Sequence, residues 1–282
     1  MSDFLASMQR SSEARCAEAR GARPLSELES RTADMPPPPA LRAGFDRFDI
    51  IAEIKRHSPA EGALADDDNV PHAIAKRALA YARGGACAIS VLTEPSRFGG
   101  DLTHVSVASA AVESQGVPVM RKDFLVDPYQ LYEARAAGAG GALLITRMLS
   151  DAQLSEMLDV ADALGLFILI EAFDADDLAR SQDLALKRER RPLVGINTRD
   201  LTTLDVDPER LATHAPLFDH RLLSVAESGV ANAQDACRIV GLGYRLALVG
   251  TALMRARLPT AFLESMLTIA RSSGIYPEPG HG

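Results

Sequence analysis

The chain has 282 residues, 47% of them apolar, and can bury a large core as one large domain or two small ones. Its 30 basic and 38 acidic side chains give a formal net charge of −8, and Lys and Arg are scattered along it. This pattern excludes nucleic acid from the expected partners. Three cysteines without a CxxC spacing predict reduced thiols, and neither a disulfide framework nor a metal site is expected.

The sequence also limits where the protein is expected to work. The N-terminal residues lack the apolar segment of a secretory signal, and no window approaches the roughly 20 apolar residues of a membrane span. We therefore expect a cytoplasmic protein with no membrane partner. For its assembly we expect a monomer or a weak homo-oligomer.

The N-terminal part differs in composition from the rest. Residues 3 to about 30 are rich in Ala, Glu and Arg, which predicts helix, and Pro36 to Pro39 follow, a run that no helix crosses. The proline run is typical of a stiff connector. We expect residues 1–44 to form a helical extension with a proline linker, and residues 45–282 to form the catalytic domain.

Beyond the linker, short apolar runs alternate with longer amphipathic segments. Runs that are apolar on both faces are typical of parallel strands. The expected strands are 50–54, 86–92, 117–120, 142–145, 166–170, 193–196, 222–226 and 246–249. The expected helices are 70–83, 103–114, 128–137, 150–164, 174–181, 208–214, 232–240 and 260–271. Eight such units predict an α/β fold, a (β/α)8 TIM barrel; the alternative, a doubly wound open sheet, lacks a GxGxxG after its first strand.

Six of the expected strands end in, or lead directly into, polar or turn residues, at the end where a (β/α)8 barrel carries its chemistry. They are Glu53 and Lys55, Lys122 and Asp123, Glu171, Asn197 and Arg199, Glu227 and Ser228, and Gly250 and Thr251. For any one of them, a strand that simply ends in solvent explains the charge equally well. Each unpaired charge in the interior lowers the stability of the fold by several kcal/mol. A ring of charged side chains is therefore expected only where the charges pair with one another or take part in catalysis.

Two of the expected loops suit a phosphate group. The segments after the last two strands contain Gly229 and Gly250, which let backbone N–H groups approach an anion, although each glycine alone also fits an ordinary turn. Lys55 and Arg199 supply positive charge. The expected phosphate- and substrate-binding residues are Lys55, Ser58, Arg199, Gly229, Gly250 and Thr251.

Taken in order, seven segments between about residues 45 and 256 resemble the indole-3-glycerol phosphate synthase family. They are IIAEIKRHSPAEG, AISVLTEPSRFGGDL, PVMRKDFLVDPYQLYEARAAGA, LIEAF, VGINTRDLTTLDVD, VAESGV and LVGTALM. The resemblance implies a barrel enzyme of tryptophan biosynthesis that uses no metal or organic cofactor. Its phosphorylated small-molecule substrate, 1-(2-carboxyphenylamino)-1-deoxyribulose 5-phosphate, would lose CO2 and water to give indole-3-glycerol phosphate.

The resemblance also implies roles for individual residues. The positions that match the family's catalytic set are Lys122, Glu171, Lys55, Glu53, Asn197, Glu227 and Ser228. Lys122 would be the general acid and Glu171 the general base, while Lys55 would contact a carboxylate or the phosphate, or donate a proton. Glu53 would hold the lysines, and Asn197 and Glu227 would bind substrate hydroxyls or orient the acid and base. Two lysines that face one cavity would lower each other's pKa unless carboxylates balance them.

The apolar part of the expected site would hold the aromatic ring of the substrate. The positions that match ring contacts in the family are Phe98, Phe124, Leu144 and Leu201. Each would more often be a core residue if met alone.

A few positions differ from the residues that are usual in the family. Thr198, Ala226 and Thr251 replace more common residues, but none of these changes removes an expected acid or base. They leave open a paralogue with the same chemistry in a specialised pathway. The sequence also leaves open a Schiff-base lyase with Lys55 or Lys122 as nucleophile, and a non-catalytic phosphosugar-binding barrel.

Overall fold

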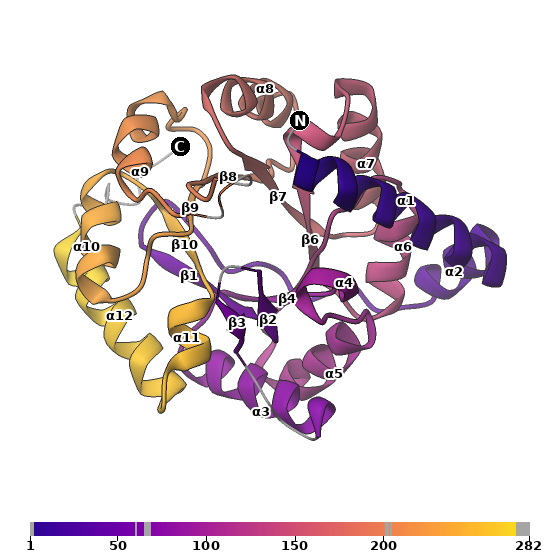
Figure 1. Cartoon of the computed structure of the whole chain (residues 1–282), viewed down its shortest axis with the longest axis horizontal. Helices are drawn as coiled ribbons and strands as arrows, with labels where there is room; N and C mark the ends of the chain where they lie inside the picture. The colour runs from indigo at the N-terminus through magenta and orange to yellow at the C-terminus, as the bar shows by residue number, and fades with distance from the viewer. Residues whose placement is uncertain (1–2, 60, 65–68, 201–202, 204, 275–282) are drawn as a thin grey trace.

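The computed structural model describes residues 3–59, 61–64, 69–200, 203 and 205–274. Within these residues, eight parallel strands close into a barrel in the order β1, β10, β9, β8, β7, β6, β5, β4, and β4 pairs again with β1. Helices surround the strands (Figure 1). The predicted (β/α)8 fold is therefore confirmed, and the open-sheet alternative is wrong because the sheet closes on itself.

The observed strands lie within a few residues of the predicted ones. They are β1 (Asp49–Ile54), β4 (Ala88–Leu92), β5 (Val119–Lys122), β6 (Gly141–Ile145), β7 (Phe167–Ala172), β8 (Leu193–Asn197), β9 (Ser224–Glu227) and β10 (Leu246–Val249). Several predicted strands stop too early, because β5, β7, β8 and β9 continue into the polar residues at their carboxyl ends. A short antiparallel pair in the segment after β1, formed by β2 (His57–Ser58) and β3 (Gly62–Ala63), was not predicted.

The helices between the barrel strands also follow the predicted pattern, but the short helices over 95–98 and 251–255 were not predicted, and the predicted N-terminal helix is broken into two. The helices are α1 (Asp3–Ala22), α2 (Leu25–Ala33), α3 (Val70–Arg83), α4 (Pro95–Phe98), α5 (Thr103–Val112), α6 (Tyr129–Ala136), α7 (Asp151–Ala163), α8 (Ala175–Leu186), α9 (Glu209–His214), α10 (Ala233–Gly241), α11 (Thr251–Arg255) and α12 (Pro259–Ser273). Helix α8 runs past the predicted end at residue 181, since no Gly or Pro stops it there. Among the described helices, none has the length and apolar composition that crossing a membrane requires.

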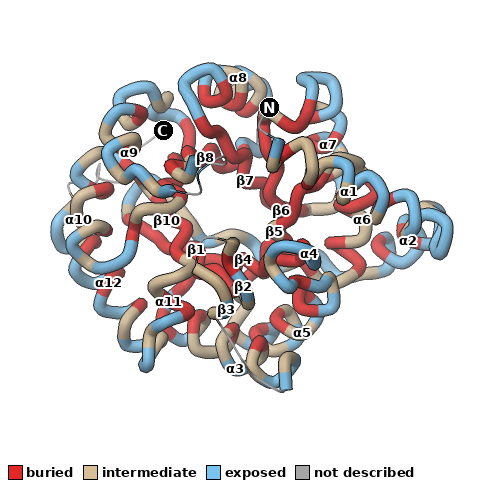
Figure 2. The backbone as a smooth tube through the Cα atoms, viewed as in Figure 1, coloured by how far each residue is buried: buried red, intermediate tan, exposed pale blue. Residues whose placement is uncertain are grey.

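The core lies inside the barrel and between the barrel and its helices. All six residues of β1 and all six of β7 are buried, so these strands are covered on both faces. Figure 2 shows this as buried residues along the strands and exposed residues on the outer sides of the helices. Burial on both faces explains why the strands form near-continuous apolar runs.

The N-terminal helices lie outside the ring, against α6 (Figure 1). Leu5 and Met8 of α1 are buried in the same apolar cluster as residues of β5 and β6. Arg15 of α1 donates hydrogen bonds of 2.8 and 3.0 Å to the carboxylate of Asp123, the residue after β5. Helix α1 is thus attached to the end of the strand that carries Lys122.

Candidate active site

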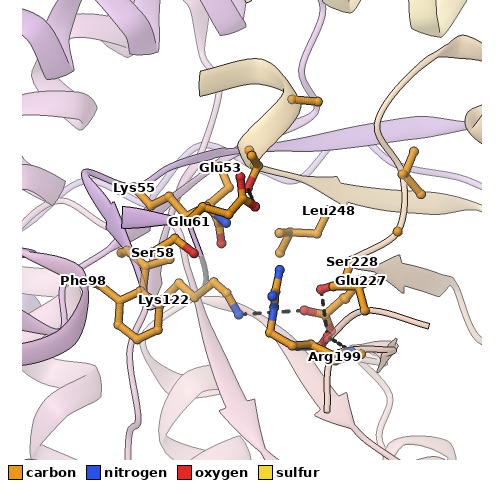
Figure 3. A pocket seen from close by; sticks show the side chains of 18 of the residues that line it. Glu53, Lys55, Ser58, Glu61, Phe98, Lys122, Arg199, Glu227, Ser228 and Leu248 are labelled. Atoms are coloured by element: carbon orange, nitrogen blue, oxygen red, sulfur yellow. Dashed lines mark hydrogen bonds and ion pairs between the residues drawn. The ribbon is translucent and has the colours of Figure 1, made fainter. Parts of the chain in front are cut away.

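The carboxyl ends of the strands open into a cavity of about 980 Å³. Almost every site residue expected from the sequence lines it: Glu53, Lys55, Ser58, Phe98, Lys122, Phe124, Glu171, Asn197, Arg199, Glu227, Ser228, Gly229, Gly250 and Thr251. Figure 3 shows the side chains of Lys122, Arg199 and Glu227 pointing toward one another in this cavity. The closed barrel brings together strand ends that are far apart in the sequence.

Two of the residues expected to contact the aromatic ring, Leu144 and Leu201, are not confirmed as contacts. Leu144 does not line the cavity, whereas its neighbours Leu143 and Ile145 do. Successive side chains of a strand point to opposite faces, so the side chain of Leu144 is turned away from the cavity and buried in the surrounding core. The prediction for Leu144 is therefore wrong by one residue. Leu201 lies outside the described residues.

A hydrogen-bonded chain links the ends of four strands. The ammonium of Lys122 on β5 donates to Oε2 of Glu171 on β7 at 3.0 Å. The amide of Asn197 on β8 donates to the other oxygen of Glu171 at 2.8 Å. The hydroxyl of Ser228, just after β9, donates to Oδ1 of Asn197 at 2.9 Å. Both oxygens of Glu171 are thereby held, and its carboxylate is fixed beside a cation.

Glu227 adds a second buried carboxylate beside Lys122. Its Oε2 lies 3.9 Å from Nζ of Lys122, and neither of its oxygens has a hydrogen-bond partner among the described residues. Burial raises the pKa of Glu227 well above its usual range, and the nearby charge of Glu171 raises it further, while Lys122 only partly opposes this. This side chain therefore binds a proton more readily than an exposed glutamate does.

Gly195 on β8 makes the position of Glu227 possible. A Cβ atom on Gly195 would lie 2.2 Å from Oε1 of Glu227, closer than any nonbonded contact permits. The absence of a side chain at this position opens the space that the carboxyl group fills. Gly195 lies in one of the segments that carry the family resemblance, but its role was not predicted, because it depends on a residue of the neighbouring strand.

The lysines and Glu53 perturb one another's ionisation. Burial lowers the pKa of Lys122, but the charges of Glu171, Glu227 and Glu53 outweigh it, and the net pKa lies above the ordinary lysine value. Burial raises the pKa of Glu53, but Lys55, whose Nζ lies 3.1 Å away, and Lys122 hold the net pKa below its usual range. The carboxylates thus outweigh the mutual repulsion of the lysines, and Lys122 stays charged at neutral pH.

The opposite side of the cavity carries the groups expected to bind an anion. Gly250 packs against the pair of Glu53 and Lys55: a Cβ there would lie 2.1 Å from Oε2 of Glu53 and 3.2 Å from Nζ of Lys55. The ammonium of Lys55 is therefore beside the loop that leads to Thr251. The absence of a side chain at Gly250 thus leaves room for the ion pair.

The loop after β9 has an unusual backbone. Ser228 has φ of +67°, and it is the one described residue other than glycine with positive φ; Gly229 follows with φ of +76°. A left-handed conformation at a residue with a side chain costs about 1–2 kcal/mol. The hydrogen bond from Ser228 to Asn197 helps to hold the loop in this conformation.

The apolar wall of the cavity is aromatic and includes a residue that the sequence did not indicate. The rings of Phe98 and Phe124 lie 6.2 Å apart, and Phe4 of α1 meets Phe124 edge to face at 5.9 Å. Phe4 also lines the cavity. No motif surrounds Phe4, so nothing in the sequence connected it with Phe124, which lies 120 residues later in the chain.

Two charged residues at the rim were also missed. Glu61, between β2 and β3, accepts a 3.1 Å hydrogen bond from the hydroxyl of Thr251 and pairs with Arg255 of α11 at 2.8 Å. Both line the cavity. Glu61 lies inside a segment that carries the family resemblance, and Arg255 directly follows another. Their positions in the sequence could therefore have indicated that they belong to the site.

Solved structures share the fold. 3-Hexulose-6-phosphate synthase from Salmonella typhimurium aligns with a TM-score of 0.59 at 14% identity, over 80% of this chain and 100% of the other. Tryptophan synthase from M. tuberculosis aligns with a TM-score of 0.54 at 17% identity, over 80% of this chain and 94% of the other. At these identities the likeness supports the barrel fold alone.

Sequence relatives are much closer. Indole-3-glycerol phosphate synthase of Leifsonia xyli subsp. xyli (strain CTCB07) is 42% identical over 255 residues, which cover 89% of this chain and 94% of the relative. The protein of the same name from Azospirillum brasilense is 41% identical over 276 residues, or 95% of this chain and all of the relative. The family model described as indole-3-glycerol phosphate synthase matches residues 5–266. The chain belongs to the indole-3-glycerol phosphate synthase family, the decarboxylating carbon–carbon lyases of tryptophan biosynthesis.

Proposed function

We propose that Lys122 and Glu171 are the acid and base with which this barrel converts 1-(2-carboxyphenylamino)-1-deoxyribulose 5-phosphate to indole-3-glycerol phosphate. The observation that carries this assignment is the 3.0 Å contact between the two groups in a cavity that Lys55 and Arg199 also line. An acid and a base at hydrogen-bond distance, facing one pocket, meet the geometric requirement for paired proton transfer.

In this proposal the two ends of the substrate bind at different sides of the cavity. The phosphate lies against the loops of Gly229, Gly250 and Thr251, with Lys55 supplying positive charge. The carboxylated aromatic ring packs against Phe98 and Phe124, which form part of the apolar wall. This orientation brings the ketone between the two ends close to Lys122.

Ring closure is the first step. The ring carbon that bears the carboxylate attacks the ketone carbon, a C–C bond forms, and the electrons of the carbonyl move to its oxygen. That oxygen then takes a proton from Lys122. The carboxylates around Lys122 keep it charged, and a developing alkoxide is a stronger base than an amine, so the transfer is favourable despite the raised pKa of Lys122.

Loss of CO2 and water completes the reaction. The electrons of the broken bond to the carboxylate restore the aromatic ring, and the new hydroxyl leaves as water when it receives a proton from the ammonium of Lys55, the second lysine of the cavity. A base must take up a proton near the amine nitrogen, and Glu171 is the carboxylate assigned to this step. Asn197 orients it through the 2.8 Å hydrogen bond, and Glu227, whose oxygens have no hydrogen-bond partner among the described residues, is available to bind a substrate hydroxyl.

The lysines argue against a Schiff-base lyase. Imine formation needs a neutral amine as nucleophile. The carboxylates around Lys122 raise its pKa, and Lys55 is paired with Glu53. Borohydride added during turnover is expected to trap no covalent adduct on either lysine. A stable adduct would contradict the proposed mechanism.

Turnover of the unsubstituted substrate tests the proposed function directly. The purified chain should form indole-3-glycerol phosphate, seen as a rise in indole fluorescence, with no added metal or cofactor. If only substrates with a substituted ring are converted, the chain serves a specialised pathway with the same chemistry. If none is converted, the proposed function is wrong.

We also propose that the enzyme works in the cytoplasm, as a monomer or a weak homo-oligomer. Every proposed catalytic and binding residue that the structure describes belongs to a single cavity of one chain, so no second subunit is required. Activity per chain should stay constant on dilution through any dissociation seen in analytical ultracentrifugation. Loss of activity on dissociation would overturn this proposal.

A further inference from the structure

The rim of the cavity contains a carboxylate among the groups proposed to bind phosphate. Oε1 of Glu61 accepts from the hydroxyl of Thr251 at 3.1 Å, and Oε2 pairs with the guanidinium of Arg255 at 2.8 Å. A phosphate oxygen bound through Thr251 would need the same donor. Glu61 therefore makes the contacts that an anionic ligand would make there.

The local backbone fixes the direction of Glu61. It lies between β2 and β3, which pair through Ser58 and Gly62, and its N–H donates to the carbonyl of Ser58 at 3.2 Å. The pair is attached to α4, where Nδ1 of His57 is 3.0 Å from the carbonyl of Arg97. Figure 3 shows Glu61 on the side of the cavity that also holds Glu53 and Lys55.

Charge prevents Glu61 and a phosphate from sharing these partners. Two anions a few ångströms apart repel each other, and the hydroxyl of Thr251 has a single proton to donate. The side chain of Arg255 is 62% exposed and that of Glu61 24%, so the existing ion pair is weak enough to exchange. A guanidinium binds a phosphate at least as well as a carboxylate, through paired N–H groups.

We infer that Glu61 competes with the substrate's phosphate for Thr251 and Arg255, and that Arg255 binds the phosphate once Glu61 is displaced. This inference rests on the proposed phosphate site at Gly229, Gly250 and Thr251. The product carries the same phosphate group, so Glu61 also helps to release it. Glu61 thus sets the affinity for the phosphate group of both substrate and product.

Inorganic phosphate is the probe that tests the inference, both as a competitive inhibitor of turnover and as a ligand in calorimetry. Glu61→Gln keeps the size of the side chain and removes its charge, so the Ki and Kd of phosphate should fall about three- to fivefold. The inhibition constant of the product should fall by a similar factor. Arg255→Ala should raise the Kd of phosphate. In the Arg255→Ala background, Glu61→Gln should then lower the Kd of phosphate by a smaller factor than it does in the wild type.

Glu264→Gln is the matched control, because it makes the same change in net charge at an exposed position on α12. It should leave the Kd of phosphate close to the wild-type value. Circular dichroism melting would check that every variant folds. An unchanged or higher Kd in Glu61→Gln would overturn the competition, and an unchanged Kd in Arg255→Ala would overturn the role of Arg255.

A further variant separates this inference from the proposed phosphate site. Thr251→Val removes the hydroxyl that both anions need. If it leaves phosphate binding unchanged, the proposed site itself is wrong. If it weakens phosphate binding while Glu61→Gln changes nothing, the site stands and the competition alone is refuted.

Discussion

Single residues decide where the charged groups of this cavity lie. Gly195 leaves space for Glu227, and Gly250 leaves space for the ion pair of Glu53 and Lys55. Glu227 in turn lies beside Lys122 with a raised pKa. Small changes in volume at the two glycines are therefore expected to act on catalysis through the carboxylates that they accommodate.

Gly195→Ala tests this dependence. Its Cβ would lie 2.2 Å from Oε1 of Glu227 and would displace that carboxyl group, so kcat/KM should fall about tenfold or more. Gly241→Ala on α10 is the matched control, because an added Cβ there meets nothing within 4 Å, and it should keep full activity. Steady-state kinetics with a measured melting temperature checks the prediction, and full activity of Gly195→Ala would contradict the account of Glu227.

Several residues of the site could be predicted from the sequence, and the reasons are local. Glu53, Lys122, Glu171 and Asn197 interrupt or end apolar runs, and the barrel places every such end at one rim. Phe4, Gly195 and Arg255 escaped prediction, because each acquires its role from a segment far away in the chain. Leu144 was misplaced because a one-residue shift reverses the face of a strand.

At the scale of elements, helix α1 and strand β5 are joined through Asp123. This carboxylate accepts hydrogen bonds from Arg15 of α1 and, at 2.7 Å, from the hydroxyl of Thr93, and it pairs with Arg121 at 3.4 Å. Burial alone would raise the pKa of Asp123, but these partners outweigh it and lower the pKa to about 2. The link lies one residue from Lys122, so the docking of α1 also supports the position of the proposed acid.

Asp123 gives stability a dependence on acid pH. Its pKa falls from 3.8 to about 2 on folding, and this difference of about 1.8, at about 1.4 kcal/mol for each pKa unit, amounts to roughly 2.5 kcal/mol. A lowered carboxyl pKa stabilises the folded state above the unfolded value, and the contribution is lost as the pH falls from about 4 to about 2. Asp123→Asn should therefore be clearly less stable than the wild type at pH 7, with the difference shrinking in that window.

Urea unfolding at several pH values measures this difference. Asp183→Asn, at an exposed position on α8, is the matched control and should change stability little. A difference between Asp123→Asn and the wild type that stays constant from pH 7 to pH 2 would show that the ionisation of Asp123 is not responsible.

At the scale of the whole molecule, the N-terminal extension and the barrel act together. Helix α1 contributes Phe4 to the cavity, Leu5 and Met8 to the core, and Arg15 to the link with Asp123. Helix α2 packs against α6. We expect the extension of residues 1–44 to be part of the working enzyme, although the barrel closes without it.

Removal of residues 1–22 is the corresponding test. The shortened chain should keep the circular dichroism spectrum of a barrel but melt at a lower temperature, because buried apolar contacts and the pairing of Asp123 are lost. Its KM should rise, because Phe4 no longer closes the aromatic wall. Phe4→Ala in the full chain separates the two effects, since it should raise KM with a smaller loss of stability. Unchanged melting temperature and KM in the shortened chain would contradict this view of the extension.

The central claim is that Lys122 acts as the acid and Glu171 as the base in forming the indole ring. The most direct measurement is the rate of indole fluorescence with the wild type, Lys122→Met, Glu171→Gln and Arg199→Ala, together with substrate binding to each. We expect the first two variants to lower kcat by about 10²-fold or more while binding changes little, and Arg199→Ala chiefly to raise KM. Near wild-type kcat in Lys122→Met, or an equal loss of binding in all three variants, would contradict the claim.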